Sequence, residues 1–130
     1  MNIYNWPLIE CLLHKAQNGA GEPFTPRVYA EELAVTMSNR GDPVGNLDEF
    51  KVLATDYEAM LLKQGYIEPR RESEGGTGEN YELTERGSRL LSLIDSSIPG
   101  DSHPLEVLDA QQDPLDPQTF DALTAQPQIA

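Results

Sequence analysis

Three side chains in this sequence could take part in nucleophilic or metal chemistry: Cys11, His14 and His103. Cys11 and His14 lie three residues apart and would share one face of a helix, which is a spacing that metal ligands can use. A structural zinc site needs four ligands, and the predicted fold offers no second pair. We therefore interpret Cys11 as a buried thiol and His14 as a partly exposed histidine, and we expect no metal and no cofactor.

The sequence lacks the motifs of the common catalytic sites. It contains no nucleophile elbow, no phosphate-binding loop and no paired-carboxylate motif. The run Gly75-Gly76-Thr77-Gly78 lacks the lysine and the following helix that a phosphate-binding loop requires. We therefore expect no catalytic residues and no enzymatic activity.

The cysteine content and the hydropathy of the chain indicate in which cellular compartment the protein resides. The single cysteine excludes an intramolecular disulfide and favours a reducing environment. No run approaches 18 consecutive apolar residues, and residues 1–6 lack the basic start and apolar run of a secretory signal. We expect a cytoplasmic protein that does not enter a membrane.

Acidic residues outnumber basic ones by 22 to nine, which gives a net charge of −13. Residues 1–95 hold all nine basic residues and 16 of the acids, whereas residues 96–130 hold six acids and no basic residue. Proteins bind nucleic acids largely by neutralising phosphates with Lys and Arg. This chain must either concentrate its few cations on one face or bind something else.

Lys51, Arg70 and Arg71 are the candidates for nucleic-acid binding. Arg70 and Arg71 come shortly before the glycine-rich run, so they could contact phosphates from the tip of a hairpin. The alternative is a solvated strand end that pairs with Glu72 or Glu74. Two arginines cannot replace the six or more phosphate contacts that DNA-binding proteins make.

Six carboxylates are the candidates for binding a protein partner. Four lie in the predicted third helix and two follow the arginines: Asp48, Glu49, Asp56, Glu58, Glu72 and Glu74. Such a surface could attract a partner with a basic surface, or imitate the phosphates of a duplex and so occupy a DNA-binding protein. The alternative is that acidity serves only solubility.

Residues 1–95 are long enough for one domain with one core. Apolar residues at helical spacing predict helices over residues 5–17, 25–37, 46–64 and 84–94. Each of these ranges begins at or close to a residue that favours a helix start: Asn5, Thr25, Asn46 or Asp48, and Thr84. Extended runs at 66–71 and 81–83 predict a hairpin whose loop turns flexibly at its glycines.

The segment 96–130 differs from the rest of the chain. It contains five prolines, six acids and few bulky apolar residues, so it cannot bury enough surface to offset the entropy of ordering it. We expect an acidic tail that is largely disordered. Its apolar clusters could anchor in a partner's groove, pack back on the domain or have no role, and their main members are Leu105 and Leu108, then Phe120 and Leu123.

Two segments resemble the winged helix-turn-helix superfamily of bacterial and phage proteins. Leu61-Leu62-Lys63-Gln64-Gly65-Tyr66-Ile67 is similar to the end of its third helix, and Tyr81-Glu82-Leu83-Thr84-Glu85-Arg86-Gly87 to the end of its wing. In this pattern Gly65 reverses the chain, Thr84 caps the next helix, and Gly87 lets that helix pass close to its neighbour. The resemblance covers residues 5–95 and implies a mainly α fold with a small β-hairpin: three helices, a two-stranded wing and a C-terminal fourth helix.

The sequence departs from a DNA-binding helix-turn-helix in two ways, and both favour a protein partner over DNA. The connection between the second and third helices spans about nine residues instead of three or four. The helix that would enter the major groove carries four acids against two lysines. We therefore favour a non-enzymatic interaction protein whose acidic surface and tail bind a basic protein partner, such as a DNA mimic or an inhibitor encoded by a mobile element. The alternative is a transcriptional regulator that binds DNA as a homodimer, which would be supported by a basic ridge of Arg27, Arg40, Lys51, Arg70 and Arg71.

Overall fold

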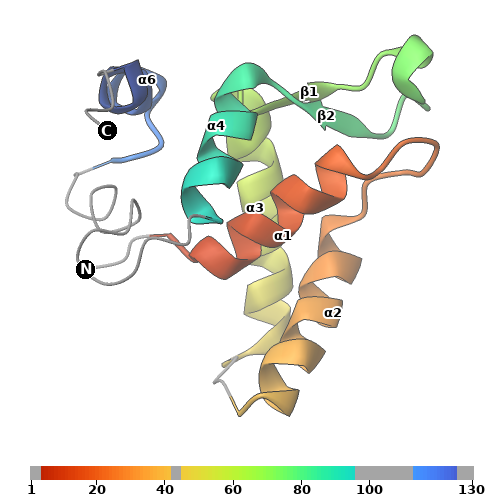
Figure 1. The fold of residues 1–130 in the computed structure, drawn as a ribbon. Coiled ribbons are helices and arrows are strands. Elements are labelled where there is room, and N and C mark those ends of the chain that lie inside the picture. Colours follow the sequence, from red (N-terminus) through yellow and green to blue (C-terminus); the bar gives the residue numbers. More distant parts are fainter. Residues whose placement is uncertain (1–3, 42–44, 96–112, 126–130) are drawn as a thin grey trace.

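The computed structural model describes residues 4–41, 45–95 and 113–125 (Figure 1). Three helices come first: α1 (Trp6–Gln17), α2 (Pro26–Asn39) and α3 (Leu47–Lys63). An antiparallel hairpin of β1 (Ile67–Pro69) and β2 (Tyr81–Leu83) follows, then α4 (Glu85–Ile94) and α6 (Pro117–Ala125). The predicted order of three helices, a hairpin and a fourth helix is confirmed. Over the described residues the fold is mainly helical with one small two-stranded sheet.

Side chains at the helix starts explain where three of the helices begin. The Oδ1 atom of Asn5 accepts a hydrogen bond from the first turn of α1 at 3.2 Å, and that of Asn46 accepts one from the first turn of α3 at 3.1 Å. Asn46 rather than Asp48 therefore caps α3. Thr84 caps α4 through its hydroxyl, whereas Thr25 precedes α2 without a side-chain hydrogen bond.

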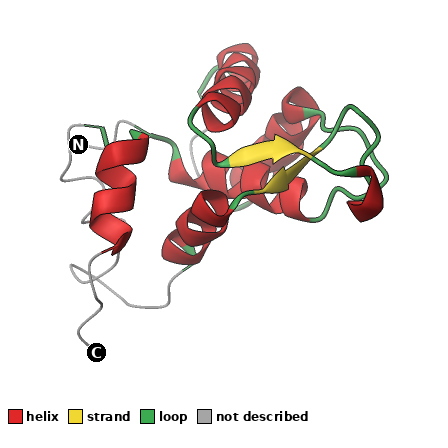
Figure 2. Ribbon diagram, turned by 90° about the horizontal axis from the view of Figure 1, so that it is seen from above, coloured by secondary structure: helices red, strands yellow, loops and turns green. Residues whose placement is uncertain are grey.

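Helix α1 lies at the centre of the core and contacts α2, α3, α4 and β2 (Figures 1 and 2). Four of its apolar residues are fully buried: Leu8, Ile9, Leu12 and Leu13. Helices α3 and α4 contribute buried stripes of Phe50, Ala54, Tyr57 and Leu61 in α3, and of Leu90, Leu91 and Ile94 in α4. Because only one face of α3 is buried, its opposite face is left to solvent.

The hairpin joins α3 to α4 through a tight turn and a close contact. Gly65 follows α3 with a φ of 81°, a left-handed conformation that glycine adopts most readily. The Thr84 hydroxyl donates a hydrogen bond to the Gly65 carbonyl (2.6 Å) and accepts one from the Gly87 N–H (3.1 Å). A Cβ atom on Gly87 would lie 1.9 Å from the Tyr66 carbonyl oxygen. The role predicted for Gly87 is therefore confirmed.

The loop between the two strands is attached to the body, whereas its glycines had predicted a flexible turn. A short 3₁₀ turn, η1 (Glu72–Glu74), follows β1. The buried Asn80 side chain donates hydrogen bonds to the carbonyls of Gly19 (2.9 Å) and Gly75 (3.1 Å). The N–H of Gly21 also donates to the Gly75 carbonyl, at 2.8 Å. These bonds fasten the loop to the connection between α1 and α2.

The structure differs from the expected disordered tail at residues 113–125, which include α6. Leu115 and Phe120 are fully buried. The Tyr66 ring packs edge to face against Phe120 with 5.3 Å between ring centroids, and its hydroxyl donates a hydrogen bond to the Leu115 carbonyl at 2.8 Å. Few apolar side chains suffice here because they complete an existing core instead of building one. Leu105 and Leu108 lie outside the described residues.

Helix α6 and the hairpin loop lie on opposite sides of the body in both views (Figures 1 and 2). Helix α2 and the first half of α3 extend away from the hairpin. Within the described segments, no helix combines the length and the apolar character needed to cross a membrane.

Replacement of Gly87 by alanine tests the close contact between α4 and Tyr66. We expect Gly87→Ala to lower the free energy of unfolding by about 2–3 kcal/mol, because the added methyl group must push α4 away from the Tyr66 carbonyl. Ser92→Ala, at an exposed position of the same helix, should change this free energy by less than about 0.5 kcal/mol. Urea unfolding measures both variants, and equal stabilities would contradict the contact.

Candidate functional site

The solvent-facing side of α3 brings three of the predicted carboxylates together. Asp48, Glu49 and Asp56 line an open hollow of about 300 Å³ with Val52 and Leu53. Positions three and four residues apart follow one another along one face of a helix, which explains why these side chains meet. We call these five residues the acidic face of α3.

An exposed apolar side chain lies within this acidic face. Val52 is 49% exposed although it is a branched hydrocarbon side chain. A single exposed apolar residue is ordinary on a protein surface. Here, however, Val52 shares the hollow with three carboxylates, and none of the three forms an ion pair with a described residue. The face therefore offers an apolar contact and uncompensated negative charge together.

The other three predicted carboxylates do not join this face. Glu58 lies about 200° around the helix axis from Asp56, at about 100° per residue. It faces β2, where burial raises the pKa of Glu58 and a hydrogen bond with Tyr81 acts in the opposite direction. Glu72 and Glu74 belong to η1 in the hairpin loop. The six carboxylates predicted as one surface therefore lie in three different places.

Arg70 holds three segments of the fold together. Its guanidinium donates hydrogen bonds to four backbone carbonyls: Tyr81 (3.1 Å), Glu74 (3.0 Å), Ala16 (2.6 Å) and Gln17 (3.0 Å). These carbonyls belong to β2, η1 and the last turn of α1. A guanidinium has five N–H donors, and most of those of Arg70 are directed at the protein's own backbone. This arrangement favours a structural role over phosphate binding.

Arg71 and Lys51, the other nucleic-acid candidates, pair with carboxylates of the chain itself. The Nε atom of Arg71 lies 3.1 Å from Oε1 of Glu82, and its Nη2 atom lies 4.0 Å from Oε1 of Glu74. Arg71 therefore fits the alternative interpretation, in which the arginines lie at a solvated strand end and pair with nearby glutamates. The Nζ atom of Lys51 lies 3.3 Å from Oε2 of Glu31 in α2.

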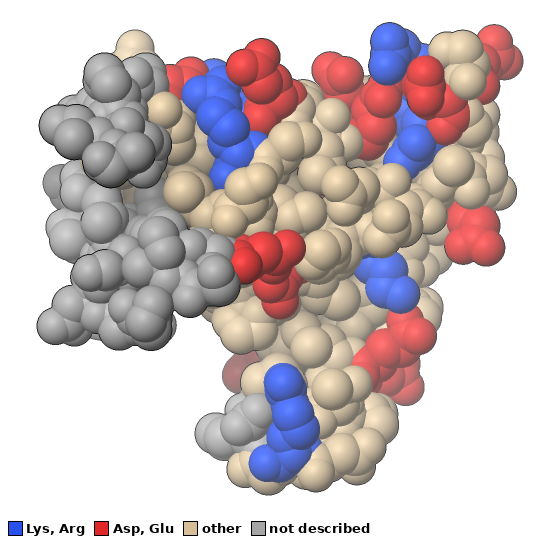
Figure 3. Space-filling view, viewed as in Figure 1, with Lys and Arg blue, Asp and Glu red and all other residues tan. Residues whose placement is uncertain are grey.

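Two of the five residues of the expected basic ridge lie at opposite ends of α2. Arg27 lies in the first turn of α2 and Arg40 at its C-terminal cap, so about 20 Å of helix separates them at 1.5 Å per residue. On the face shown in Figure 3, the basic side chains of the described segments are scattered, and most of them lie next to acidic side chains. The arrangement that would support the DNA-binding alternative is not present there.

The tail anchors predicted at Phe120 and Leu123 pack against the protein's own core. Arg86 of α4 holds α6 in place by donating two hydrogen bonds to the Asp121 carboxylate, one from Nε at 2.9 Å. The same guanidinium donates to the Gln64 carbonyl at the end of α3, at 2.8 Å. Its hydrogen bond holds the pKa of Asp121 below the ordinary value. Of the three possibilities for the tail clusters, packing on the domain is the one found for Phe120 and Leu123.

A cluster of Glu10, His14 and Asp95 lies apart from these residues. The Nε2 atom of His14 lies 3.3 Å from Oδ2 of Asp95, and Glu10 is one helical turn before His14. A hydrogen bond with Asp95, together with burial and the Asp95 charge, raises the pKa of Glu10 to about 7. Burial raises the pKa of the Cys11 thiol, which is not part of this group, and His103 lies outside the described residues. The spacing of Glu10 and His14 was visible in the sequence, but their approach to Asp95 was not.

Comparison with known proteins assigns the chain to no group. No protein-family model matches it, and no curated protein or solved structure matches it either. The functional argument therefore rests on the geometry described above.

Removal of the Arg70 guanidinium tests its structural role. We expect Arg70→Ala to lower the free energy of unfolding by about 2–3 kcal/mol, because the carbonyls in three segments lose a charged donor. Arg71→Ala is the matched control, since its side chain is 68% exposed and should matter much less. Thermal and urea unfolding measure both, and the reverse order of stability would contradict the assignment.

The Arg86–Asp121 pair makes the attachment of α6 sensitive to pH. Because the pKa of Asp121 is lower in the folded protein than in the unfolded chain, the pair stabilises the fold above the ordinary Asp pKa of 3.8 and is lost as pH falls through the folded value. Asp121→Asn should therefore cost at most about 1 kcal/mol at pH 6, since the pair is partly exposed.

This cost should shrink as the pH falls below the ordinary Asp pKa. Urea unfolding of the wild type and the variant across this pH range measures it. Asp56→Asn, which removes an exposed carboxylate without a described ion pair, is the control. A cost for Asp121→Asn that stays constant down to pH 2 would contradict the assigned ion pair.

Proposed function

We propose that this protein is a non-enzymatic winged-helix interaction protein whose acidic face of α3 binds a protein partner with a basic surface. The observation that carries the proposal is the grouping of Asp48, Glu49 and Asp56 around the exposed Val52. Cationic side chains of a partner would neutralise the carboxylates, and an apolar side chain would fill the hollow. On such a surface the carboxylates attract a basic partner at long range, and the apolar side chains are buried once the two proteins are in contact.

The order and junctions of the elements support the winged-helix assignment. Three helices precede an antiparallel hairpin in which Ile67 pairs with Leu83, and a fourth helix follows. Gly65, Thr84 and Gly87 make the contacts that the resemblance implies for these positions. In a winged helix that binds DNA, α3 would be the recognition helix, so it is the element expected to meet a partner.

Charge on α3 favours a protein over a nucleic acid as the partner. A helix in the major groove normally presents donors to base edges and cations to phosphates. This helix instead presents three carboxylates, and the nearby Lys51 pairs with Glu31. Carboxylates along a helix can imitate the phosphates of a duplex, so a DNA-binding protein is the partner class that fits best. An inhibitor of this type, encoded by a mobile element, is the biological role we favour.

Neutralising the acidic face tests the proposal. The variant combines Asp48→Asn, Glu49→Gln and Asp56→Asn. A matched control removes the same charge at exposed positions elsewhere, through Glu22→Gln, Glu68→Gln and Glu79→Gln. We expect the wild type and the control to capture a basic protein from a cell extract, and the variant to capture at least about 10-fold less, a loss of about 1.4 kcal/mol. Equal capture by the two triple variants would contradict a role for this face.

Duplex DNA provides the second arm of this experiment. Fluorescence anisotropy with the full chain and a mixed-sequence duplex should show no saturable binding at about 50 mM salt, where electrostatic contacts to DNA are strong. Binding that weakens steeply as salt rises would favour the transcriptional regulator and reject the proposed function.

A further inference from the structure

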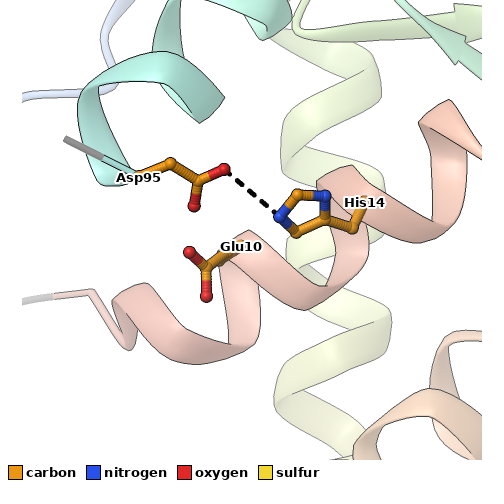
Figure 4. A group of neighbouring side chains, drawn as sticks. All are labelled: Glu10, His14 and Asp95. Carbon is orange, nitrogen blue, oxygen red and sulfur yellow. Dashed lines mark ion pairs between the residues drawn. The ribbon is translucent and has the colours of Figure 1, made fainter. Parts of the chain in front are cut away.

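Glu10, His14 and Asp95 form a cluster of potential metal ligands that the proposed function does not use (Figure 4). One donor atom from each side chain lies within 4.8 Å of the other two. Tetrahedral ligands at about 2.1 Å from a zinc ion are about 3.4 Å apart. Small side-chain rotations would therefore bring all three donors onto one ion.

Two packed helices fix the backbone positions of these ligands. Glu10 and His14 lie one turn apart on α1, next to the fully buried Ile9 and Leu13. Asp95 is the C-terminal cap residue of α4, which packs against α1. All three side chains point into the space between the two helices (Figure 4). The backbone at all three positions therefore belongs to two packed helices or their ends.

The cluster holds two neighbouring carboxylates without a compensating Lys or Arg. Among the described ion pairs, Asp95 contacts only the imidazole of His14, and Glu10 takes part in none. The side chains of His14 and Asp95 are 44% and 40% exposed. Water can therefore reach the cluster and complete the coordination of a bound ion.

We infer that Glu10, His14 and Asp95 form a binding site for a divalent first-row transition cation, with Zn²⁺ as the expected occupant. Imidazole together with carboxylates suits these ions, whereas Mg²⁺ and Ca²⁺ prefer oxygen ligands alone. Three protein ligands and one water make an open site from which the ion can exchange. The ion would link α1 to α4 and stabilise the fold. The site shares no residue with the acidic face of α3, so it stands or falls independently of the proposed function.

Zinc titration of the metal-free, full-length chain tests the site. We expect one equivalent of Zn²⁺ to bind in calorimetry and to raise the melting temperature, because the ion binds the folded state preferentially. Glu10→Gln, His14→Gln and Asp95→Asn should each weaken binding by at least about 10-fold, since even residues that only orient metal ligands matter this much. Equal affinity for Mg²⁺ would overturn the inference, as would the absence of saturable zinc binding.

Two control variants and one spectroscopic measurement exclude other zinc ligands. Cys11→Ser removes the adjacent thiol and His103→Ala removes the other histidine, and both proteins should bind zinc as the wild type does. In the unmodified protein, the ring signals of His14 should shift on zinc addition while those of His103 stay unchanged. This readout does not depend on the folding of a variant. Loss of binding in either control, or movement of the His103 signals alone, would overturn the inference.

Discussion

The close approach of α4 to the Tyr66 carbonyl is the constraint on which the rest of the structure depends. The glycine at position 87 permits this approach, and the Thr84 hydroxyl secures it by bonding to Gly65 on one side and to Gly87 on the other. The Thr84 N–H donates a hydrogen bond to the same Tyr66 carbonyl at 3.2 Å, next to the pair of Ile67 and Leu83, so the end of α3 and the start of α4 are held together. The orientation of α3 in turn decides which of its side chains enter the core and which form the acidic face.

Local features of the fold could be predicted because they depend on neighbours in the sequence. The caps at Asn5 and Thr84, the buried stripe of α3 and the turn at Gly65 all follow from residue type and spacing. The order of elements over residues 5–95 followed from these signals. The attachment of residues 113–125 could not be predicted in this way, because it depends on the ring and hydroxyl of Tyr66, which only the folded body brings next to Phe120 and Leu115. A proline-rich, acidic composition shows that such a segment cannot form a core by itself. It does not show whether the segment can pack against a core that already exists.

The candidate site was predicted less well than the fold, for two separate physical reasons. Residue counts predicted one acidic surface, but helical phase places Glu58 on the opposite side of α3 from Asp56, and that phase could have been calculated from the sequence. The role of Arg70 is different, because its partners are backbone carbonyls from three segments. Carbonyls are present at every residue, so no residue pattern reveals which of them an arginine will meet. The approach of Asp95 to His14 was hidden for another reason, because it depends on how α4 packs against α1.

Residues 96–112 join α6 covalently to the body, so its attachment takes place within one molecule. An attachment within one molecule does not depend on the protein concentration. The segment is attached through one buried ring, one tyrosine hydroxyl and one ion pair. Helix α6 and the residues before it thus occupy the surface around Tyr66, and any external molecule that binds there must compete with a segment of the same chain.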